Sequence, residues 1–327
     1  MSATPSYGGN PNGPSGALPG NDHKASPSFF FAQDADYLRH FLSSKRQSVH
    51  EELDKAVYLR EPKIIHEAMR YALLTDGKYC APILCIAACE LVGGTQETAM
   101  ASACALEMIH AASIIQDDCM DDGEVRRGRP AIHKVYGEAM AILAADALIA
   151  LAFEHIASAS RGVHPATVVR VIAELAKASG SEGMAAGQVV HLATTGQSDI
   201  SLDQLEFIHN HKTGALLEAS VKIGAIIGGG SDEAIRTLQK YARCVGLLNQ
   251  IVDDILDATE SSEELGKMAG KDAADGKIRF PDVMGLQRCR QFAEELNQGA
   301  KQHLLGFHAD NVRPLLCFSD YIAFRQR

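Results

Sequence analysis

Residues 166–280 contain no proline, and this stretch constrains the fold more than any other feature of the chain. Proline breaks helices because it lacks an N–H and its ring clashes with the preceding turn. The segment is rich in helix formers, and the glycine stop at 228–230 is followed by a polar helix start, Ser231-Asp232-Glu233. Aromatic residues make up only 6% of the chain, and no period-two alternation is long enough for a sheet. We therefore predict an all-α fold, one bundle of many helices.

The composition excludes several classes of protein. The chain has 41 acidic and 31 basic residues, a net charge of −10, which argues against a nucleic-acid-binding protein. No apolar run reaches the roughly 18 uncharged residues of a membrane span, so no transmembrane segment is expected. The eight cysteines lie mostly in apolar helical patterns, which favours reduced core thiols in an intracellular protein. Cys85 and Cys89, four residues apart, leave a metal or redox pair as the less favoured alternative.

The N-terminal segment differs from the rest of the chain. Residues 1–28 hold five of the eleven prolines and five glycines, so we predict a disordered tail before a single domain at 29–327. The segment has one lysine and no arginine, unlike an arginine-rich transit peptide, and it lacks the apolar core of a secretory signal. This weak signal favours a cytoplasmic location.

Two acidic clusters with the same spacing lie on otherwise apolar helical patterns. They are Asp117-Asp118-Cys119-Met120-Asp121 and Asp253-Asp254-Ile255-Leu256-Asp257. The first and last carboxylates of each cluster share a helix face. One such cluster could equally be a solvated helix end, but two copies make that interpretation less favoured. Magnesium uses one or two carboxylates together with substrate phosphates, so the pair predicts a metal-bound diphosphate. Arg126 and Arg127 follow the first cluster, Lys267, Lys271 and Lys277 follow the second, and Lys212 lies between the two in a mostly apolar helical pattern.

Several motifs, taken in chain order, resemble those of the trans-prenyl diphosphate synthases. They are Asp117-Asp118-x-x-Asp121, Arg126-Arg127-Gly128-x-Pro130, Gly187-Gln188, His211-Lys212-Thr213-Gly214 and Gln250-x-x-Asp253-Asp254-x-x-Asp257. The resemblance covers about residues 30–325 and is closest to the plant-type geranylgeranyl diphosphate synthases. It implies an isoprenoid synthase-type helical bundle around a central prenyl cavity. It also implies a magnesium-dependent prenyltransferase of isoprenoid biosynthesis, which condenses isopentenyl diphosphate with dimethylallyl, geranyl or farnesyl diphosphate to give geranylgeranyl diphosphate.

The resemblance also implies roles for individual residues. Asp117, Asp121 and Asp253 would hold up to three Mg²⁺ ions with the bound diphosphate, and Asp118, Asp254 and Asp257 complete the two catalytic motifs. Lys78, His110 and Arg127 would bind isopentenyl diphosphate, although a lone histidine such as His110 is more often a core residue. The implied ligands of the allylic diphosphate are Arg126, Lys212, Thr213, Gln250, Lys267 and Lys277.

The sequence departs from the family pattern at four places. Ala81 stands where the family has an arginine, and losing a charge-assisted phosphate contact costs about 1.5–3 kcal/mol, roughly ten- to a hundred-fold in binding. His191 replaces an aspartate near the allylic pocket, and Asn249 replaces an aromatic residue before Gln250. The first aspartate motif also lacks the two extra residues of plant-type relatives.

These departures leave two functional hypotheses open. The first is an active enzyme with altered affinity; the second is a weakly active or inactive subunit that dimerises with an active synthase and modulates its product. We favour the enzyme because both acidic motifs are retained. A terpene cyclase is less favoured, since the second acidic motif and the Arg126-Arg127 pair fit a synthase better.

Product, assembly and compartment are less constrained by the sequence. The small Ala112 and Ser113 before Asp117 would leave the hydrocarbon pocket open for a C20 product, while the shortened motif leaves C10 or C15 open. The resemblance implies a homodimer, or a heterodimer with a related subunit. It also makes the plastid the alternative to the cytoplasm.

Overall fold

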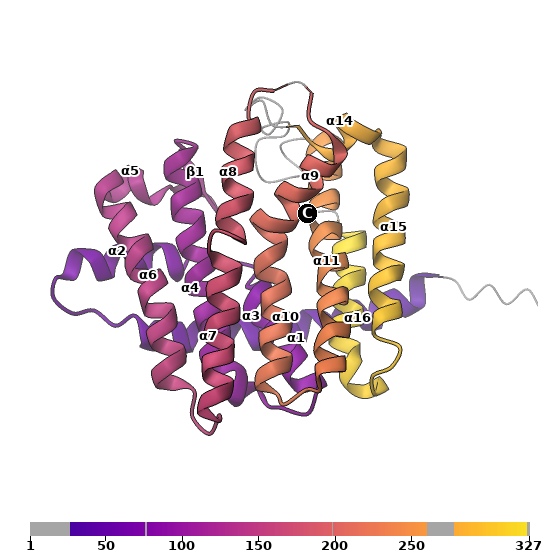
Figure 1. The fold of residues 1–327 in the computed structure, drawn as a ribbon, viewed down its shortest axis with the longest axis horizontal. Coiled ribbons are helices and arrows are strands. Elements are labelled where there is room, and N and C mark those ends of the chain that lie inside the picture. Colours follow the sequence, from indigo (N-terminus) through magenta and orange to yellow (C-terminus); the bar gives the residue numbers. More distant parts are fainter. Residues whose placement is uncertain (1–26, 76, 198, 260–277, 326–327) are drawn as a thin grey trace, which may run out of the picture.

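The computed structural model describes residues 27–75, 77–197, 199–259 and 278–325, and within these ranges the chain is almost entirely helical (Figure 1). The predicted all-α bundle is confirmed, apart from one short hairpin. The elements in chain order are α1 (Pro27–Ala56), α2 (Lys63–Leu73), α3 (Cys80–Leu91), α4 (Gln96–Met120), β1 (Val125–Arg126), β2 (Arg129–Pro130), α5 (Ile132–Tyr136), α6 (Glu138–Ala159), α7 (Pro165–Ser179), α8 (Met184–Thr194), α9 (Leu202–His209), the π-helix η1 (Asn210–Gly214), α10 (Ala215–Ile227), α11 (Asp232–Thr259), α14 (Phe280–Met284), α15 (Leu286–His303) and α16 (Ala309–Phe324).

Local sequence signals set the helix ends. Thr95 caps α4 by accepting a hydrogen bond from the Thr98 backbone N–H. α10 ends at Ile227, and Gly229 takes a positive φ of 81° before α11 starts at Asp232, at the break predicted from the glycines. Residues 1–26 lie outside the described part of the chain, so the disordered tail stays a prediction. α1 begins at Pro27.

The centre of the bundle is α3, which packs between α4 and α10. A Cβ added at Gly224 would lie 2.1 Å from the carbonyl oxygen of Cys85, so the backbones of α10 and α3 are almost in contact. Cys85 and Cys89 are fully buried at this contact, and burial raises the pKa of both thiols, that of Cys89 to about 11. All eight cysteines are free. The two thiols therefore act as neutral packing groups, as the sequence favoured.

Two helices are long and apolar enough, by length and composition alone, to cross a membrane. They are α4 and α6, with 72% and 33% of the most apolar window buried inside the protein. The two helices pack against each other within the bundle, and the core helices of many proteins meet the same criterion. α6 differs from α4 in keeping much of its apolar surface exposed.

Candidate active site

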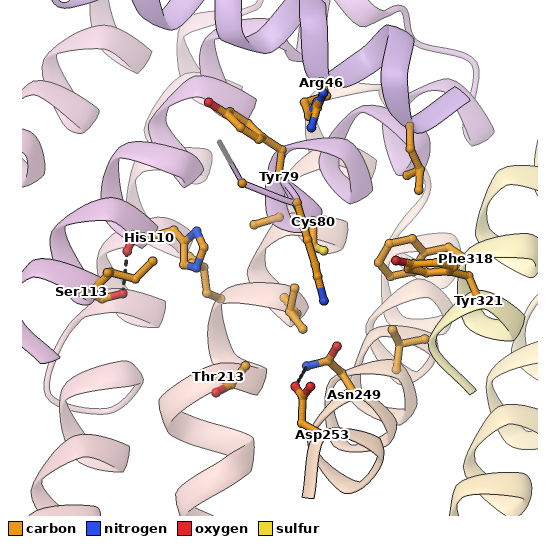
Figure 2. A pocket seen from close by; sticks show the side chains of 18 of the residues that line it. Arg46, Tyr79, Cys80, His110, Ser113, Thr213, Asn249, Asp253, Phe318 and Tyr321 are labelled. Atoms are coloured by element: carbon orange, nitrogen blue, oxygen red, sulfur yellow. Dashed lines mark hydrogen bonds between the residues drawn. The ribbon is translucent and has the colours of Figure 1, made fainter. Parts of the chain in front are cut away.

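A cavity of about 1620 Å³ lies among α1, α3, α4, α6, α7, α8, η1, α10, α11 and α16. Single-ligand pockets are typically about 300–1,000 Å³, so this cavity has room for two small ligands or one long one. Apolar residues such as Ile149, Met184 and Leu216 line one part of it. In Figure 2, His110, Thr213 and Asp253 surround another part. The residues implied by the resemblance that border the cavity are Lys78, His110, Asp117, Arg127, Lys212, Thr213 and Asp253.

The first acidic cluster lies at the C-terminal end of α4, where the helix dipole disfavours negative charge. Asp117 borders the cavity and accepts a hydrogen bond from Lys212 Nζ at 2.8 Å. Asp118 points elsewhere and is buried against Arg126, whose Nε lies 3.0 Å from Oδ1 and 3.1 Å from Oδ2. Burial opposes the charge of Arg126, but the hydrogen bond and charge of Asp118, with Asp117 and Asp121, raise its pKa. The negative charges of Asp117 and Asp118 are thus paired with cations of the protein itself, Lys212 and Arg126.

Asp121 lies just beyond the last helical residue, at the exposed C-cap of α4. Its backbone N–H donates to the Asp117 carbonyl at 2.9 Å, so helical spacing continues to this residue. The predicted relation between the two acids, one turn apart, therefore holds for the backbone.

The hairpin β1–β2 separates the two adjacent arginines. Arg127 and Gly128 form its two-residue turn with positive φ angles of 51° and 75°, as a type I′ turn requires. Arg126 reaches back to Asp118, whereas Arg127 Nη1 donates to the Thr75 carbonyl at 3.2 Å. The two guanidinium groups therefore have different partners, and the separate roles implied for them stay predictions.

The π-helix η1 positions Lys212 and Thr213. Single π-turns occur frequently at functional sites. The backbone of α8 meets η1 at Gly187, where an added Cβ would lie only 2.1 Å from the Lys212 backbone nitrogen. One residue further on, Gln188 Nε2 lies 3.4 Å from Asp117 Oδ1. The Gly187-Gln188 motif thus joins α8 to both Lys212 and the first acidic cluster.

The second acidic cluster lies on α11 and also presents its first aspartate to the cavity. The side chain of Asp253 is 39% exposed, and its Oδ1 lies 2.8 Å from Arg325 Nη2. Asn249 Nδ2 donates to Asp253 Oδ2 at 3.3 Å, the contact drawn in Figure 2. Asn249 therefore orients a cavity-facing carboxylate.

The other two aspartates of this cluster are buried away from the cavity. Asp254 accepts hydrogen bonds from Gln250 Nε2 at 2.8 Å and from the Phe280 backbone N–H at 2.9 Å. Asp257 accepts from Arg279 Nη1 at 3.1 Å, and its Oδ1 is buried without a hydrogen-bond partner among the described residues. These carboxylates hold α11 against α14.

Not every residue implied by the resemblance borders the cavity. Lys267 and Lys277 lie outside the described residues, so their roles stay predictions. Among the described residues, those that do not border it are Asp118, Asp121, Arg126, Gln250, Asp254 and Asp257.

The loop before α3 and the middle of α4 form a second polar wall. Lys78, His110 and Arg127 border the cavity here, together with Ala81, which is only 5% exposed. The Nδ1 atom of His110 lies 3.3 Å from Oε1 of the buried Glu107. This carboxylate fixes the orientation of the imidazole ring.

His209, near Lys212, is held in its neutral form. Burial, with the charges of His191 and Lys212, lowers the pKa of His209 to about 3. His209 Nε2 is buried without a hydrogen-bond partner in the described part of the chain.

Sequence reasoning assigned no role to Arg325, Gln188 or Arg46. Gln188 stands in a matched motif, which was a usable signal. Arg325 and Arg46 stand in none of the matched motifs and lie far in sequence from the aspartates and from Lys78, and only the folded chain brings them to the cavity.

Comparisons with known proteins agree with this geometry. The polyprenyl synthetase family model matches residues 62–304. The heterodimeric geranylgeranyl pyrophosphate synthase large subunit 1, chloroplastic, of Arabidopsis thaliana is 55% identical over 312 residues, covering 94% of this chain and 82% of that protein. The chloroplastic geranylgeranyl pyrophosphate synthase of Capsicum annuum is 55% identical over 287 residues, covering 87% of this chain and 78% of that protein.

Solved structures show the same fold. An FPP/GFPP synthase from Zymomonas mobilis superposes with a TM-score of 0.80 at 34% identity, covering 88% of this chain and 99% of that one. A geranylgeranyl pyrophosphate synthetase from Pyrococcus horikoshii gives a TM-score of 0.81 at 29% identity, covering 90% and 99%.

Proposed function

Because the chain belongs to the polyprenyl synthetase family, we propose that it is a prenyltransferase that condenses isopentenyl diphosphate with allylic diphosphates to give geranylgeranyl diphosphate. The observation that carries this proposal is one large cavity bordered by Asp117 and Asp253, the first acids of two clusters, and by separate groups of cations. Relatives more than 50% identical, named geranylgeranyl pyrophosphate synthases, support the same product.

The donor set suits magnesium, on which the family generally depends. Carboxylate oxygens from α4 and α11 border one cavity, and Mg²⁺ takes one or two carboxylates with substrate phosphates. In the described ranges no group of three or more His, Cys, Asp or Glu side chains could hold a metal by itself, which fits an ion bound jointly with a diphosphate. Asp117, Asp121 and Asp253 would hold up to three ions. The ions would neutralise the diphosphate and assist its departure.

The chain's own cations would bind and orient the two substrates. Lys212 now pairs with Asp117 and would exchange this partner for a phosphate oxygen of the allylic substrate. Lys78, His110 and Arg127 would hold isopentenyl diphosphate at the second polar wall. The further allylic ligands proposed here are Arg126, Thr213, Gln250, Lys267 and Lys277.

The reaction needs no protein nucleophile. The allylic C–O bond breaks and its electron pair leaves with diphosphate, after which the double bond of isopentenyl diphosphate attacks the allylic cation. A proton is then lost to the released diphosphate, which restores a double bond. The apolar part of the cavity, with Ile149, Met184 and Leu216, would shield the cation from water.

A C20 product is supported by the wall next to the first acidic cluster. Ser113, one turn before Asp117, borders the cavity and is small. Ala112 is fully buried and does not border it, so only one of the two small residues bears on chain length.

The non-catalytic subunit hypothesis is not favoured, because the close relatives are named as synthases.

We propose that the protein is a homodimer that assembles through α6. This helix is mostly apolar, yet Ile142 and Leu143 are 48% and 51% exposed. Ile142→Glu should give a monomer in light scattering; an unchanged mass would contradict this interface, and a dimer formed only with a second synthase would favour the heterodimer.

Comparison with relatives favours the plastid over the cytoplasm expected from the N-terminal segment, because several close relatives are named chloroplastic. We therefore propose the plastid. Uptake of the radiolabelled chain by isolated chloroplasts tests this, and its exclusion from them would return the cytoplasm as the better hypothesis.

The central test is an assay of the purified protein alone, with magnesium, isopentenyl diphosphate and each allylic diphosphate, followed by product sizing. We expect geranylgeranyl diphosphate. Asp117→Asn and Asp253→Asn should each lower kcat by about a hundred-fold or more, the scale of removing a major electrostatic contribution. Asp122→Asn is the control, because Asp122 is exposed, does not border the cavity and pairs with Lys134. No product from the protein alone, but a changed product length from a mixture with an active synthase, would establish the subunit hypothesis instead.

A further inference from the structure

The polar wall that would bind isopentenyl diphosphate has a third side, formed by α1. Residues spaced by one turn along this helix, Leu38, Leu42 and Arg46, all border the cavity. Figure 2 shows Arg46 at the α1 side of the cavity, the side on which Tyr79 and Cys80 lie. A guanidinium from α1 therefore borders the same cavity as the loop that carries Lys78.

A hydrogen bond fixes α1 beside this loop. His50, one turn after Arg46, has its Nδ1 3.1 Å from the hydroxyl of Tyr79. Tyr79 is 2% exposed and precedes α3 with a left-handed φ of 53°. The loop and α1 are thus joined through a buried side chain between Lys78 and the first turn of α3, and Arg46 is held near both.

Arg46 differs from the other cations of α1 in its pairing. Lys45 forms an ion pair with Glu90 on α3, and Arg39 lies 3.6 Å from Asp36. Arg46 has no ion-pair or hydrogen-bond partner among the described residues.

The carboxylates that border the cavity are already paired with other cations. Asp34 pairs with Arg313, Asp117 with Lys212, Asp253 with Arg325 and Asp320 with Lys301. The charge of Arg46 is therefore available for an anionic ligand.

At Ala81 the start of α3 supplies no charge to this wall. Ala81 is the second residue of α3, is 5% exposed and borders the cavity, so the start of α3 contributes a methyl group there. Lys78, His110 and Arg127 supply at most three positive charges, whereas a fully ionised diphosphate ester carries three negative charges and many acceptor oxygens. A further guanidinium can donate two parallel hydrogen bonds to a phosphate.

We propose that Arg46 of α1 binds the diphosphate of isopentenyl diphosphate and supplies the guanidinium contact that α3 lacks at Ala81. This inference rests on the proposed function, since it assigns a further binding residue to its second substrate site. Arg46 is a binding residue only, and the departure of the allylic diphosphate does not depend on it.

The test compares the wild type with Arg46→Ala, Arg39→Ala and Ala81→Arg, and with the double variant of Arg46→Ala and Ala81→Arg. Arg46→Ala should raise the KM for isopentenyl diphosphate about ten-fold, the lower end for a charge-assisted contact because Arg46 is exposed. Its kcat and its KM for the allylic substrate should stay within about two-fold. Arg39→Ala removes the same charge two turns earlier on α1, from a guanidinium that also borders the cavity but is already paired with Asp36, and it should change neither KM.

Ala81→Arg should lower the KM for isopentenyl diphosphate only slightly in the wild type, but strongly in the Arg46→Ala background, because the new arginine then replaces the missing contact. An equal KM in Arg46→Ala and Arg39→Ala would overturn the proposal, and so would an equal rise of both substrates' KM values. Calorimetric binding of isopentenyl diphosphate, without the allylic substrate, decides the role of Arg46 independently of turnover. A wild type that binds but makes no product would instead refute the proposed function.

Discussion

At the scale of single residues, the aspartates within each acidic cluster lie in different surroundings. In each cluster the first aspartate faces the cavity, and the second is buried against the protein's own donors. Helical spacing predicts that Asp253 and Asp257 share a face, but Asp257 lies one turn further along α11, where Arg279 covers it. The spacing thus predicts which residues share a face, whereas the neighbouring element decides which of them meets the ligand.

His209 gives a residue-scale prediction for acid stability. Its pKa is lowered to about 3 in the fold, against about 6.5 in an unfolded chain. Between these values the unfolded state binds more protons than the folded state, so this histidine makes stability fall as the pH drops below 6.5. At pH 5 the loss should be about 2 kcal/mol relative to pH 7.5.

His209→Leu should remove this contribution. Chemical denaturation of the wild type and the variant at pH 7.5 and at pH 5 measures it. We expect the difference in unfolding free energy between the two proteins to shift by about 2 kcal/mol in favour of the variant at the lower pH. A difference that is the same at both pH values would show that His209 is protonated in the folded protein.

At the scale of elements, local signals predicted the helices and their breaks but not the contacts between them. The glycines at 228–230 end one helix and Ser231 precedes the next. These signals involve only a few neighbouring residues, so they can be recognised in the sequence. The hairpin at 125–130 was not predicted, because its strands have two residues each and show no alternation. Of its turn residues, Arg127 was assigned to the site from its motif, and Gly128 was only part of that motif.

The contact between α8 and η1 carries an element-scale prediction. Gly187→Ala should push α8 away from η1, because the added Cβ would lie 2.1 Å from the Lys212 nitrogen and the opposing atom is backbone. We expect a lower melting temperature and a raised KM for the allylic diphosphate. Steady-state kinetics and thermal unfolding measure both.

Gly299→Ala on α15 is the matched control. There the added Cβ would make an ordinary contact, 3.7 Å from Cys244 Sγ, and alanine in a helix interior should stabilise by roughly 0.5–1 kcal/mol. A Gly187→Ala variant as stable and active as this control would show that the close contact is not needed to place Lys212.

At the scale of the whole molecule, the cavity is built by residues far apart in the sequence. Asp253 of α11 meets Arg325 near the C-terminus, and Arg46 of α1 faces the cavity beside the loop that carries Lys78. Neither arginine belongs to a matched motif, so neither contact could be predicted without the packing of α1 and α16 against the bundle. The acidic motifs could be recognised because all three aspartates of each motif lie within five residues.

These distant pairings predict how the whole protein responds to magnesium. Asp117 is balanced by Lys212 and Asp253 by Arg325 without any metal, so the fold does not need the ion to relieve repulsion among carboxylates. Chelation with EDTA should therefore abolish turnover but leave the melting temperature unchanged. Magnesium with inorganic diphosphate, at about 100 times the dissociation constant, should stabilise by about 2.7 kcal/mol, which corresponds to a rise of roughly 4 °C for a domain of this size.

Magnesium alone and diphosphate alone should each raise the melting temperature much less. The metal alone would add positive charge beside the cavity's cations, and diphosphate alone would add negative charge beside its carboxylates. The double variant Asp117→Asn with Asp253→Asn should lose the rise in melting temperature that magnesium and diphosphate cause together. Any general effect of ionic strength on its melting temperature should remain. Differential scanning calorimetry measures the melting temperature of each protein without ligand, with magnesium alone, with diphosphate alone and with both. If EDTA lowered the melting temperature of the wild type by several degrees, the ion would be structural, and the pairings of Lys212 and Arg325 would not be what balances the acids.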